Sequence, residues 1–321
     1  MHLEYWILFN LFVVGMLVLD LKVFQRQAHE IHIKEALGWS AFWIALALIF
    51  NVLVYKWFGK QKALEFLTGY LIEKSLSVDN LFVFIILFSF FRIEAKHQHR
   101  ILFWGILGAL VFRAIFIVAG VALIHRFEFI IYVFGAILIY TGFKIAFKSD
   151  EQMDPSKNIV YRLMQRFFPI TSNNTTGAFF ETINGRKYAT QFFLVLLMIE
   201  TTDVVFAVDS IPAILAISTD PFIVYTSNVF AILGLRALYF ALAGIIHLFH
   251  YLHYGLAVVL VFIGVKMTIS HFYKVPTLIS LSVVLGVLTL SVVASVLFPK
   301  KKEEEKLEKL VENVTDVKKE D

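Results

Sequence analysis

The sequence predicts an all-α polytopic membrane protein, and three observations support this class. Of the 321 residues, 59% are hydrophobic and the mean hydropathy is +0.76, which is more apolar surface than a soluble domain can bury. The apolar residues gather into stretches that are long enough to cross a bilayer as helices. Inside these stretches one acidic signature occurs twice, which indicates that the helices have a function beyond anchoring the protein in the membrane.

Nine transmembrane helices are expected, because a helix needs about 20 apolar residues to cross the hydrocarbon core. They cover residues 5–24, 38–58, 64–91, 101–124, 129–147, 190–217, 222–249, 254–272 and 278–298. The first span starts at the N-terminus and has no small-residue cleavage site, so no cleavable signal peptide is expected.

The distribution of basic residues predicts the orientation. With the N-terminus outside, the inner segments carry twenty of the 29 Lys and Arg residues and the outer segments carry five. The positive-inside rule therefore predicts an external N-terminus and a cytoplasmic C-terminus, in a prokaryotic inner membrane.

The predicted spans divide the chain into six segments. These are the first two spans (1–63), a three-span unit (64–147), a polar cytoplasmic loop (148–189), a second three-span unit (190–272), a last span (273–298) and a charged cytoplasmic tail (299–321). Within the loop, residues 179–183 and 186–190 flank Asn184-Gly185, which predicts a small β-hairpin. The loop and the tail are the regions where soluble protein partners could dock.

The two three-span units resemble one another. Ile-Leu-Gly at 106–108, followed by Arg113, recurs at 232–234, followed by Arg236. The spacing of Tyr, Gly and Lys in Tyr132–Lys144 recurs in Tyr254–Lys266. An odd number of spans per unit places the two units in opposite orientations. The sequence therefore predicts inverted repeats, which in secondary transporters place the substrate site near the bilayer midplane.

The acidic signature lies at Ile72–Asn80 in the first unit and at Ile199–Ser210 in the second. A carboxylate at the centre of a membrane helix costs about 2.5–3.5 kcal/mol of insertion free energy. We therefore expect these acids to hold a cation. Helical spacing places Glu73 and Asn80 on one face, and Glu200 and Asp203 on another. Pro212 predicts a kink or break that would turn Asp209 toward Glu200 and Asp203.

All the candidate ligands carry hard oxygen atoms, and the chain has no cysteine. Such a set suits Mg²⁺, Ca²⁺ or Mn²⁺ better than Zn²⁺ or Cu⁺. The candidates are Glu73, Asp79, Asn80, Glu200, Thr202, Asp203, Asp209 and Ser210.

Further polar residues within or near the spans have two interpretations each. Arg113 and Arg236 form structural ion pairs with the acids or contact the substrate, and Lys74 snorkels or pairs with an acid. Asp20 caps a helix at the interface or lines a vestibule, and Asn228 makes a helix–helix hydrogen bond or is a ligand.

At these motifs the chain resembles the TerC/Alx family of integral membrane proteins. The resemblance extends over roughly residues 15–295 and is carried by Glu73–Asn80, Phe206–Ala213, Thr219–Phe222 and Ser227–Ala237. The family takes its name from tellurium-resistance clusters and is grouped with the LysE-type transporter superfamily, and its Alx branch is associated with manganese export. The resemblance implies ion-handling roles for Glu73, Asp79, Asn80, Glu200, Asp203 and Asp209.

The expected function is therefore a secondary transporter that exports a divalent cation, Mn²⁺ first among them, with H⁺ antiport as the coupling. The metal would be a substrate, and no tightly bound cofactor, nucleic-acid partner or enzymatic activity is expected. One alternative is a non-transporting scaffold in a metal-stress or tellurite-resistance complex. Another, an intramembrane aspartyl protease, is disfavoured because neither Asp79 nor Asp209 lies in a Gly-x-Gly-Asp context.

Overall fold

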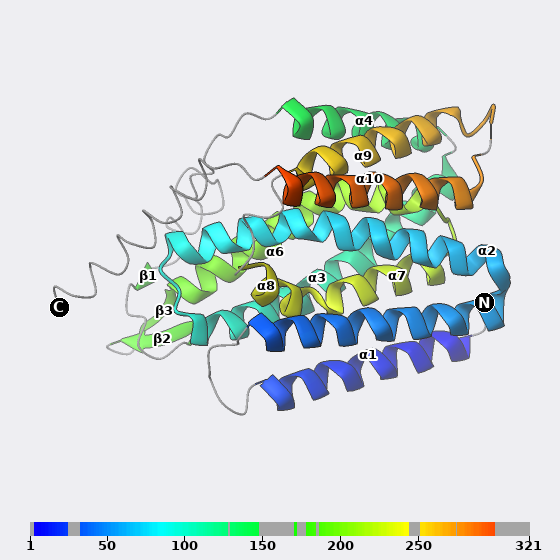
Figure 1. The fold of residues 1–321 in the computed structure, drawn as a ribbon. Helices are drawn as coiled ribbons and strands as arrows, with labels where there is room; N and C mark the ends of the chain where they lie inside the picture. Colours follow the sequence, from blue (N-terminus) through cyan, green and yellow to red (C-terminus); the bar gives the residue numbers. More distant parts are fainter. Residues whose placement is uncertain are drawn as a thin grey trace.

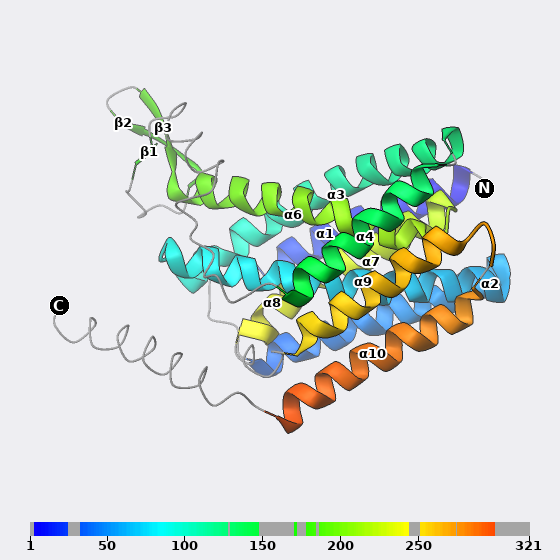
Figure 2. The ribbon, with the colours of Figure 1, turned by 90° about the horizontal axis from the view of Figure 1, so that it is seen from above.

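The fold is that of a bundle of long apolar helices. The computed structural model describes residues 3–24, 33–127, 129–147, 170–171, 178–183, 186–243, 251–273 and 275–298. Its helices are α1 (Leu3–Phe24), α2 (Ile33–Phe90), α3 (Ala95–Arg126), α4 (Ile130–Phe147), α6 (Gln191–Leu215), α7 (Pro221–Leu233), α8 (Leu235–Ala243), α9 (Leu252–Ile269) and α10 (Thr277–Leu297). They lie alongside one another (Figure 1; Figure 2), and no sheet is needed to organise the core.

The helices are long and apolar enough for a multi-pass membrane protein, which confirms the predicted class. Among the described residues, six helices meet the length and composition of a membrane span, namely α2, α3, α4, α6, α9 and α10. The pair α7 and α8, bent by 40° at Gly234, would make a seventh, and Leu3–Leu19 of α1 is a shorter apolar helix. This count is lower than the nine expected, partly because α2 extends through two of the predicted spans.

Gly59 explains why α2 covers two predicted spans. Its backbone has φ 84° and ψ 176°, which is not helical and is a region that essentially only glycine occupies. The helix reverses direction at one end of the bundle (Figure 1), and the rings of Phe50 and Phe66, one on each arm, lie 5.4 Å apart. The first arm corresponds to the predicted span 38–58 and the second to the predicted span 64–91.

The β-hairpin predicted in the loop is confirmed. Strand β2 (Phe180–Ile183) pairs antiparallel with β3 (Arg186–Thr190), with Phe180 opposite Ala189 and Ile183 opposite Arg186. The short strand β1 (Ile170–Thr171) joins β3 in parallel. This small sheet lies at one end of the bundle (Figure 2) and leads directly into α6. Of the rest of the loop, residues 148–169 and 172–177 lie outside the described part of the chain, as does the tail from 299 onward.

Glycines let α4 and α9 approach one another closely. A Cβ atom built on Gly264 would lie 2.7 Å from the carbonyl oxygen of Gly135, and one on Gly142 would lie 2.8 Å from that of Ala257. Small residues at such positions let membrane helices approach backbone to backbone, where dispersion contacts replace the missing hydrophobic drive. The other main contacts join α2 to α7 and α3 to α6.

Replacing Gly59 with alanine should destabilise the protein, because a Cβ atom strains this backbone conformation by about 1–3 kcal/mol. Gly38→Ala is the matched control on the same helix, since a Cβ atom there has open space and no unusual φ. Apparent melting temperatures of the detergent-solubilised variants measure the difference. A Gly59→Ala protein that melts together with Gly38→Ala would contradict the strained-turn interpretation.

Candidate functional site

A single arginine holds carboxylates from both acidic motifs. Arg113 of α3 is 2% exposed, and its guanidinium donates to Asp203 of α6 through Nε (3.1 Å) and Nη2 (2.8 Å). Its Nη1 donates to Glu73 of α2, a side chain that is completely buried. Bidentate, charge-assisted bonds of this kind are the strong ones in proteins. The two motifs, more than a hundred residues apart in the chain, therefore share one counter-ion.

Amide and hydroxyl groups complete this buried cluster. Nη1 of Arg113 also donates to Asn228 of α7 (3.0 Å) and to Ser210 of α6 (3.4 Å). Asn228 in turn donates to Glu73 (3.4 Å), and Asn80 of α2 donates to Asp203 (3.4 Å). Two buried oxygens, Oδ1 of Asn80 and Oγ of Ser77, have no hydrogen-bond partner among the described residues. The cluster around Arg113 is thus rich in oxygen atoms, and one of them, Oδ1 of Asn80, has no hydrogen-bond partner in the described part of the chain.

Glu200 lies apart from this arginine, in a niche that a glycine creates. It is partly buried on α6, one helical turn from Asp203, and its Oε2 has no hydrogen-bond partner in the described part of the chain. Its carboxylate lies against Gly108 of α3, so that a Cβ atom at position 108 would overlap the carboxylate oxygens. Glu200 therefore keeps its position only because residue 108 has no side chain.

The predicted break at Pro212 is absent, and Asp209 points elsewhere. Helix α6 continues through Pro212 and ends three residues later, at Leu215. So close to the helix end, the backbone hydrogen bond that proline cannot donate disturbs little of the helix. Asp209 is partly buried and accepts a hydrogen bond of 2.7 Å from Thr141 of α4. It does not turn toward the face that carries Glu200 and Asp203. In a continuous helix, residues nine positions apart, such as Glu200 and Asp209, lie on opposite sides.

The remaining predicted residues divide into three groups. Thr202 donates to the carbonyl oxygen of Met198 in its own helix (2.7 Å), Lys74 donates to that of Ala231 in α7 (3.2 Å), and Arg236 is buried in α8. Asp79 lies in α2 and Asp20 in α1, but their side chains are outside the described part of the structure. Among the described residues, no three His, Asp or Glu side chains converge as a ready-made metal site.

A second polar network, which the sequence analysis missed, lies near the Gly59 end of the bundle. Lys62 of α2 pairs with Glu65 (2.9 Å) and with Asp220 (3.3 Å), the residue that caps α7. Ser218 donates to Glu65 (2.6 Å), and Gln61 links Glu65 (3.2 Å) to Thr277 of α10 (2.8 Å). One signal was available, since Glu65 is an acid inside the predicted span 64–91, eight residues before Glu73.

The fold and the buried ion pairs define an integral, multi-pass membrane protein with a polar centre. The profile described as "Integral membrane protein TerC family" matches residues 58–303, which is most of the chain. The protein therefore belongs to the TerC family, as the motifs indicated. The match begins beside Gly59, so α1 and the first arm of α2 precede it.

Similar proteins occur in several bacteria. The chain is 54% identical over 292 residues to "Uncharacterized membrane protein STKORF319" of Myxococcus xanthus, covering 91% of this chain and 92% of the relative. It is 49% identical over 298 residues to "Putative membrane-bound redox modulator Alx" of Salmonella typhi, covering 90% and 92%. It is 43% identical over 292 residues to an uncharacterized membrane protein of Rickettsia bellii, covering 91% and 97%. No solved structure matches.

Replacing Arg113 with alanine should destabilise the protein by about 3–5 kcal/mol, because it leaves two buried carboxylates without their counter-ion. Arg126→Ala is the control, since Arg126 is exposed at the end of the same helix. Arg113→Lys should fall between the two, because an ammonium group cannot make the bidentate pair with Asp203. Thermal unfolding in detergent measures all three, and equal stability of the two alanine variants would contradict the central role of Arg113.

Replacing Gly108 with alanine should lower the stability by about 1 kcal/mol or less, because the Glu200 carboxylate that a Cβ atom would meet is the end of a flexible side chain and can move aside. A double-mutant cycle isolates this contact, because Gly108→Ala should cost little in a Glu200→Ala background. Unfolding in detergent of the two single variants and the double variant measures the coupling. A coupling energy of zero would show that Gly108 does not position Glu200.

Proposed function

We propose that the protein is a secondary transporter that exports a divalent cation, Mn²⁺ first among them, across the inner membrane, without enzymatic activity. One observation carries the proposal: carboxylates from both acidic motifs meet in the bundle interior around a single arginine, beside unsatisfied oxygens. Carboxylate, amide and hydroxyl oxygens are the donors that hard divalent cations prefer. Ionisable groups inside a membrane protein are expensive to keep there and usually serve an ion pathway.

In this proposal Arg113 is the resting counter-ion of the site. Its guanidinium pairs with Glu73 and Asp203 while no metal ion is bound, and an arriving cation replaces it between the two carboxylates. Oδ1 of Asn80 and Oγ of Ser77, which lack partners among the described residues, supply neutral oxygens, and Asn228 supplies a third. Asp79, Glu200 and Asp209 are assigned to completing the coordination or to carrying protons. After the cation is released, the Arg113 guanidinium would return between the two carboxylates and restore the empty site.

Inverted repeats and nine crossings are part of the proposal, with the arms of α2 as separate spans and the N-terminus outside. The helix contacts support the repeats. If α2, α3 and α4 correspond to α6, α7–α8 and α9, exchanging the units turns the α2–α7 contact into the α6–α3 contact. The Tyr132–Lys144 match likewise exchanges the Gly135–Gly264 contact with the Gly142–Ala257 contact. Such symmetry underlies alternating access in secondary transporters.

The network around Glu65 is consistent with a closed state on the Gly59 side. It ties α2 to Ser218 and Asp220, between α6 and α7, and to Thr277 of α10. In the proposed orientation this side faces outward, so the network lies between the Arg113 cluster and the exterior. Alternating access requires these contacts to separate before the cation leaves.

A non-transporting scaffold is the second candidate, because the Arg113 pairs would also serve acids that are purely structural. Protein partners of such a scaffold would bind the cytoplasmic loop and tail. The word "redox" in the name of the Salmonella typhi relative suggests a further role. This chain has no cysteine, so a redox role through its own thiols is excluded.

Transport into proteoliposomes tests the function. The purified chain is reconstituted with an imposed pH gradient, and fluxes of Mn²⁺, Mg²⁺, Ca²⁺, Fe²⁺ and Zn²⁺ are compared. Mn²⁺ should move fastest, and the flux should fall when the gradient is collapsed. Asp79→Ala, Asp203→Asn and Asp209→Ala should each lower the flux by about tenfold or more, since lost ligands weaken metal binding at least as much as lost supporting bonds.

Glu4→Gln is the control variant, because Glu4 is exposed on α1. Normal flux in both the Asp79→Ala and the Asp203→Asn proteins would overturn the site. No flux of any ion, together with co-purification of fixed protein partners, would favour the scaffold instead.

A further inference from the structure

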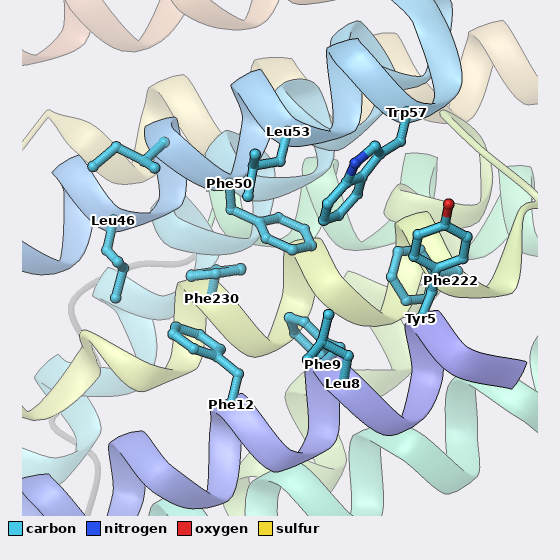
Figure 3. Close-up of a pocket in the computed structure, with 11 residues that line it drawn as sticks. Tyr5, Leu8, Phe9, Phe12, Leu46, Phe50, Leu53, Trp57, Phe222 and Phe230 are labelled. Carbon is cyan, nitrogen blue, oxygen red and sulfur yellow. The ribbon is translucent and has the colours of Figure 1, made fainter.

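A cleft of about 220 Å³ lies between α1, the first arm of α2 and α7. Its lining is apolar, unlike the polar centre around Arg113. Its floor is aromatic and buried, with Phe9 at 3% exposure and Phe222 and Phe230 at 1%. Its rim is open, since Leu8 is 61% exposed and Ile49 is 59% exposed. Figure 3 shows side chains of α1 and α2 pointing toward one another across this cleft, with Phe230 between the two helices.

Contacts of α1 with α7 and α2 frame the cleft. The hydroxyl of Tyr225 on α7 donates to Asn10 of α1 (2.9 Å). Near its start α1 also meets α2, where the ring of Tyr5 lies 5.4 Å from that of Trp57 and 5.3 Å from that of Phe58. Beyond this point Leu8 and Phe12 face Leu46 and Leu53 across the cleft.

The bilayer is what covers this cleft, because its rim belongs to apolar helices of an integral membrane protein. Hydrocarbon chains are therefore the molecules that reach it. An apolar cavity of about 150 Å³ is large enough to bind benzene, so this cleft accommodates a segment of acyl chain. Its rigid rings offer a fixed surface, and a chain held there gains dispersion contacts without competing water.

Basic residues mark where a headgroup would lie. Lys56 and Lys60 are exposed beside the Gly59 turn, at the same end of the cleft as Tyr5 and Trp57. Lys56 follows Leu53 by three residues and Ile49 by seven, so it extends the helix face that lines the cleft. The described acids near this end are Glu4, exposed in the first turn of α1, and Glu65 and Asp220, which both pair with Lys62.

We propose that the cleft binds one anionic phospholipid, with an acyl chain between α1 and α2 and the phosphate at Lys56 and Lys60. The proposal does not depend on the transport function. The lipid would join α1 and the first arm of α2, which precede the matched family region, to Phe222 and Phe230 within it. Phe222 also connects the cleft to the network around Glu65, because its backbone N–H donates to Asp220 of that network (3.1 Å).

Native mass spectrometry of the delipidated full chain tests the site. The protein is incubated with phosphatidylglycerol or phosphatidylcholine of identical acyl chains, and the adducts that survive detergent removal are counted. One phosphatidylglycerol adduct is expected, with weaker retention of phosphatidylcholine. Leu53→Phe, which fills the cleft, should lose the adduct. Leu48→Phe, the same change at an exposed position of the opposite helix face, should retain it.

Lys56→Gln should reduce the preference for phosphatidylglycerol by about fivefold, the effect expected of one surface lysine on an anionic lipid. Equal retention by the Leu53→Phe and Leu48→Phe proteins would overturn the proposal, as would equal binding of the two lipids by the unaltered chain.

A second measurement covers the case in which Leu53→Phe does not fold. Brominated phosphatidylglycerol at a low mole fraction in unlabelled phosphatidylcholine nanodiscs should quench tryptophan fluorescence beyond random mixing. That excess should disappear in Trp57→Phe, since Trp57 lines the cleft. Quenching at the random-mixing level in the unaltered chain would also overturn the proposal.

Discussion

The shared ion pair of Arg113 with Glu73 and Asp203 is the interaction on which the centre of the structure depends. Each partner is almost completely buried, and each comes from a different helix. An isolated charge in such surroundings is too costly to keep. The three helices must therefore pack together for each of these side chains to reach an oppositely charged partner. Two carboxylates around one guanidinium leave a negative balance within this cluster. In the proposed transport function, this excess of negative charge is what would attract a second cation.

Glycine positions decide how close the helices approach one another. In water, apolar side chains would drive the packing, but between helices in lipid that drive is absent. Gly135 and Gly264 bring α4 and α9 to backbone contact, and Gly108 leaves room for the carboxylate of Glu200. Gly59 has a different task, because it turns α2 back on itself. Small residues thus shape both the scaffold and the polar centre.

Two layers surround that centre on the Gly59 side. The network of Lys62, Glu65 and Asp220 ties together the helix ends, and the aromatic cleft lies between α1, the first arm of α2 and α7. Phe222 and Asp220 are near neighbours that belong to one layer each, and they are joined by a hydrogen bond.

Much of this protein was predictable from the sequence, because hydrophobic length, turn residues and buried acids carry local physical meaning. Helical class, the hairpin around Asn184-Gly185 and the membership of the TerC family were all predicted. Only the tertiary structure decided which side chains meet. Helical spacing gives the face of a residue but not the neighbouring helix, so it could not assign Glu73 and Asp203 to one arginine or Asp209 to Thr141. For the same reason Glu65 was missed: its partners Lys62 and Ser218 matter only because the α6–α7 connection packs against α2.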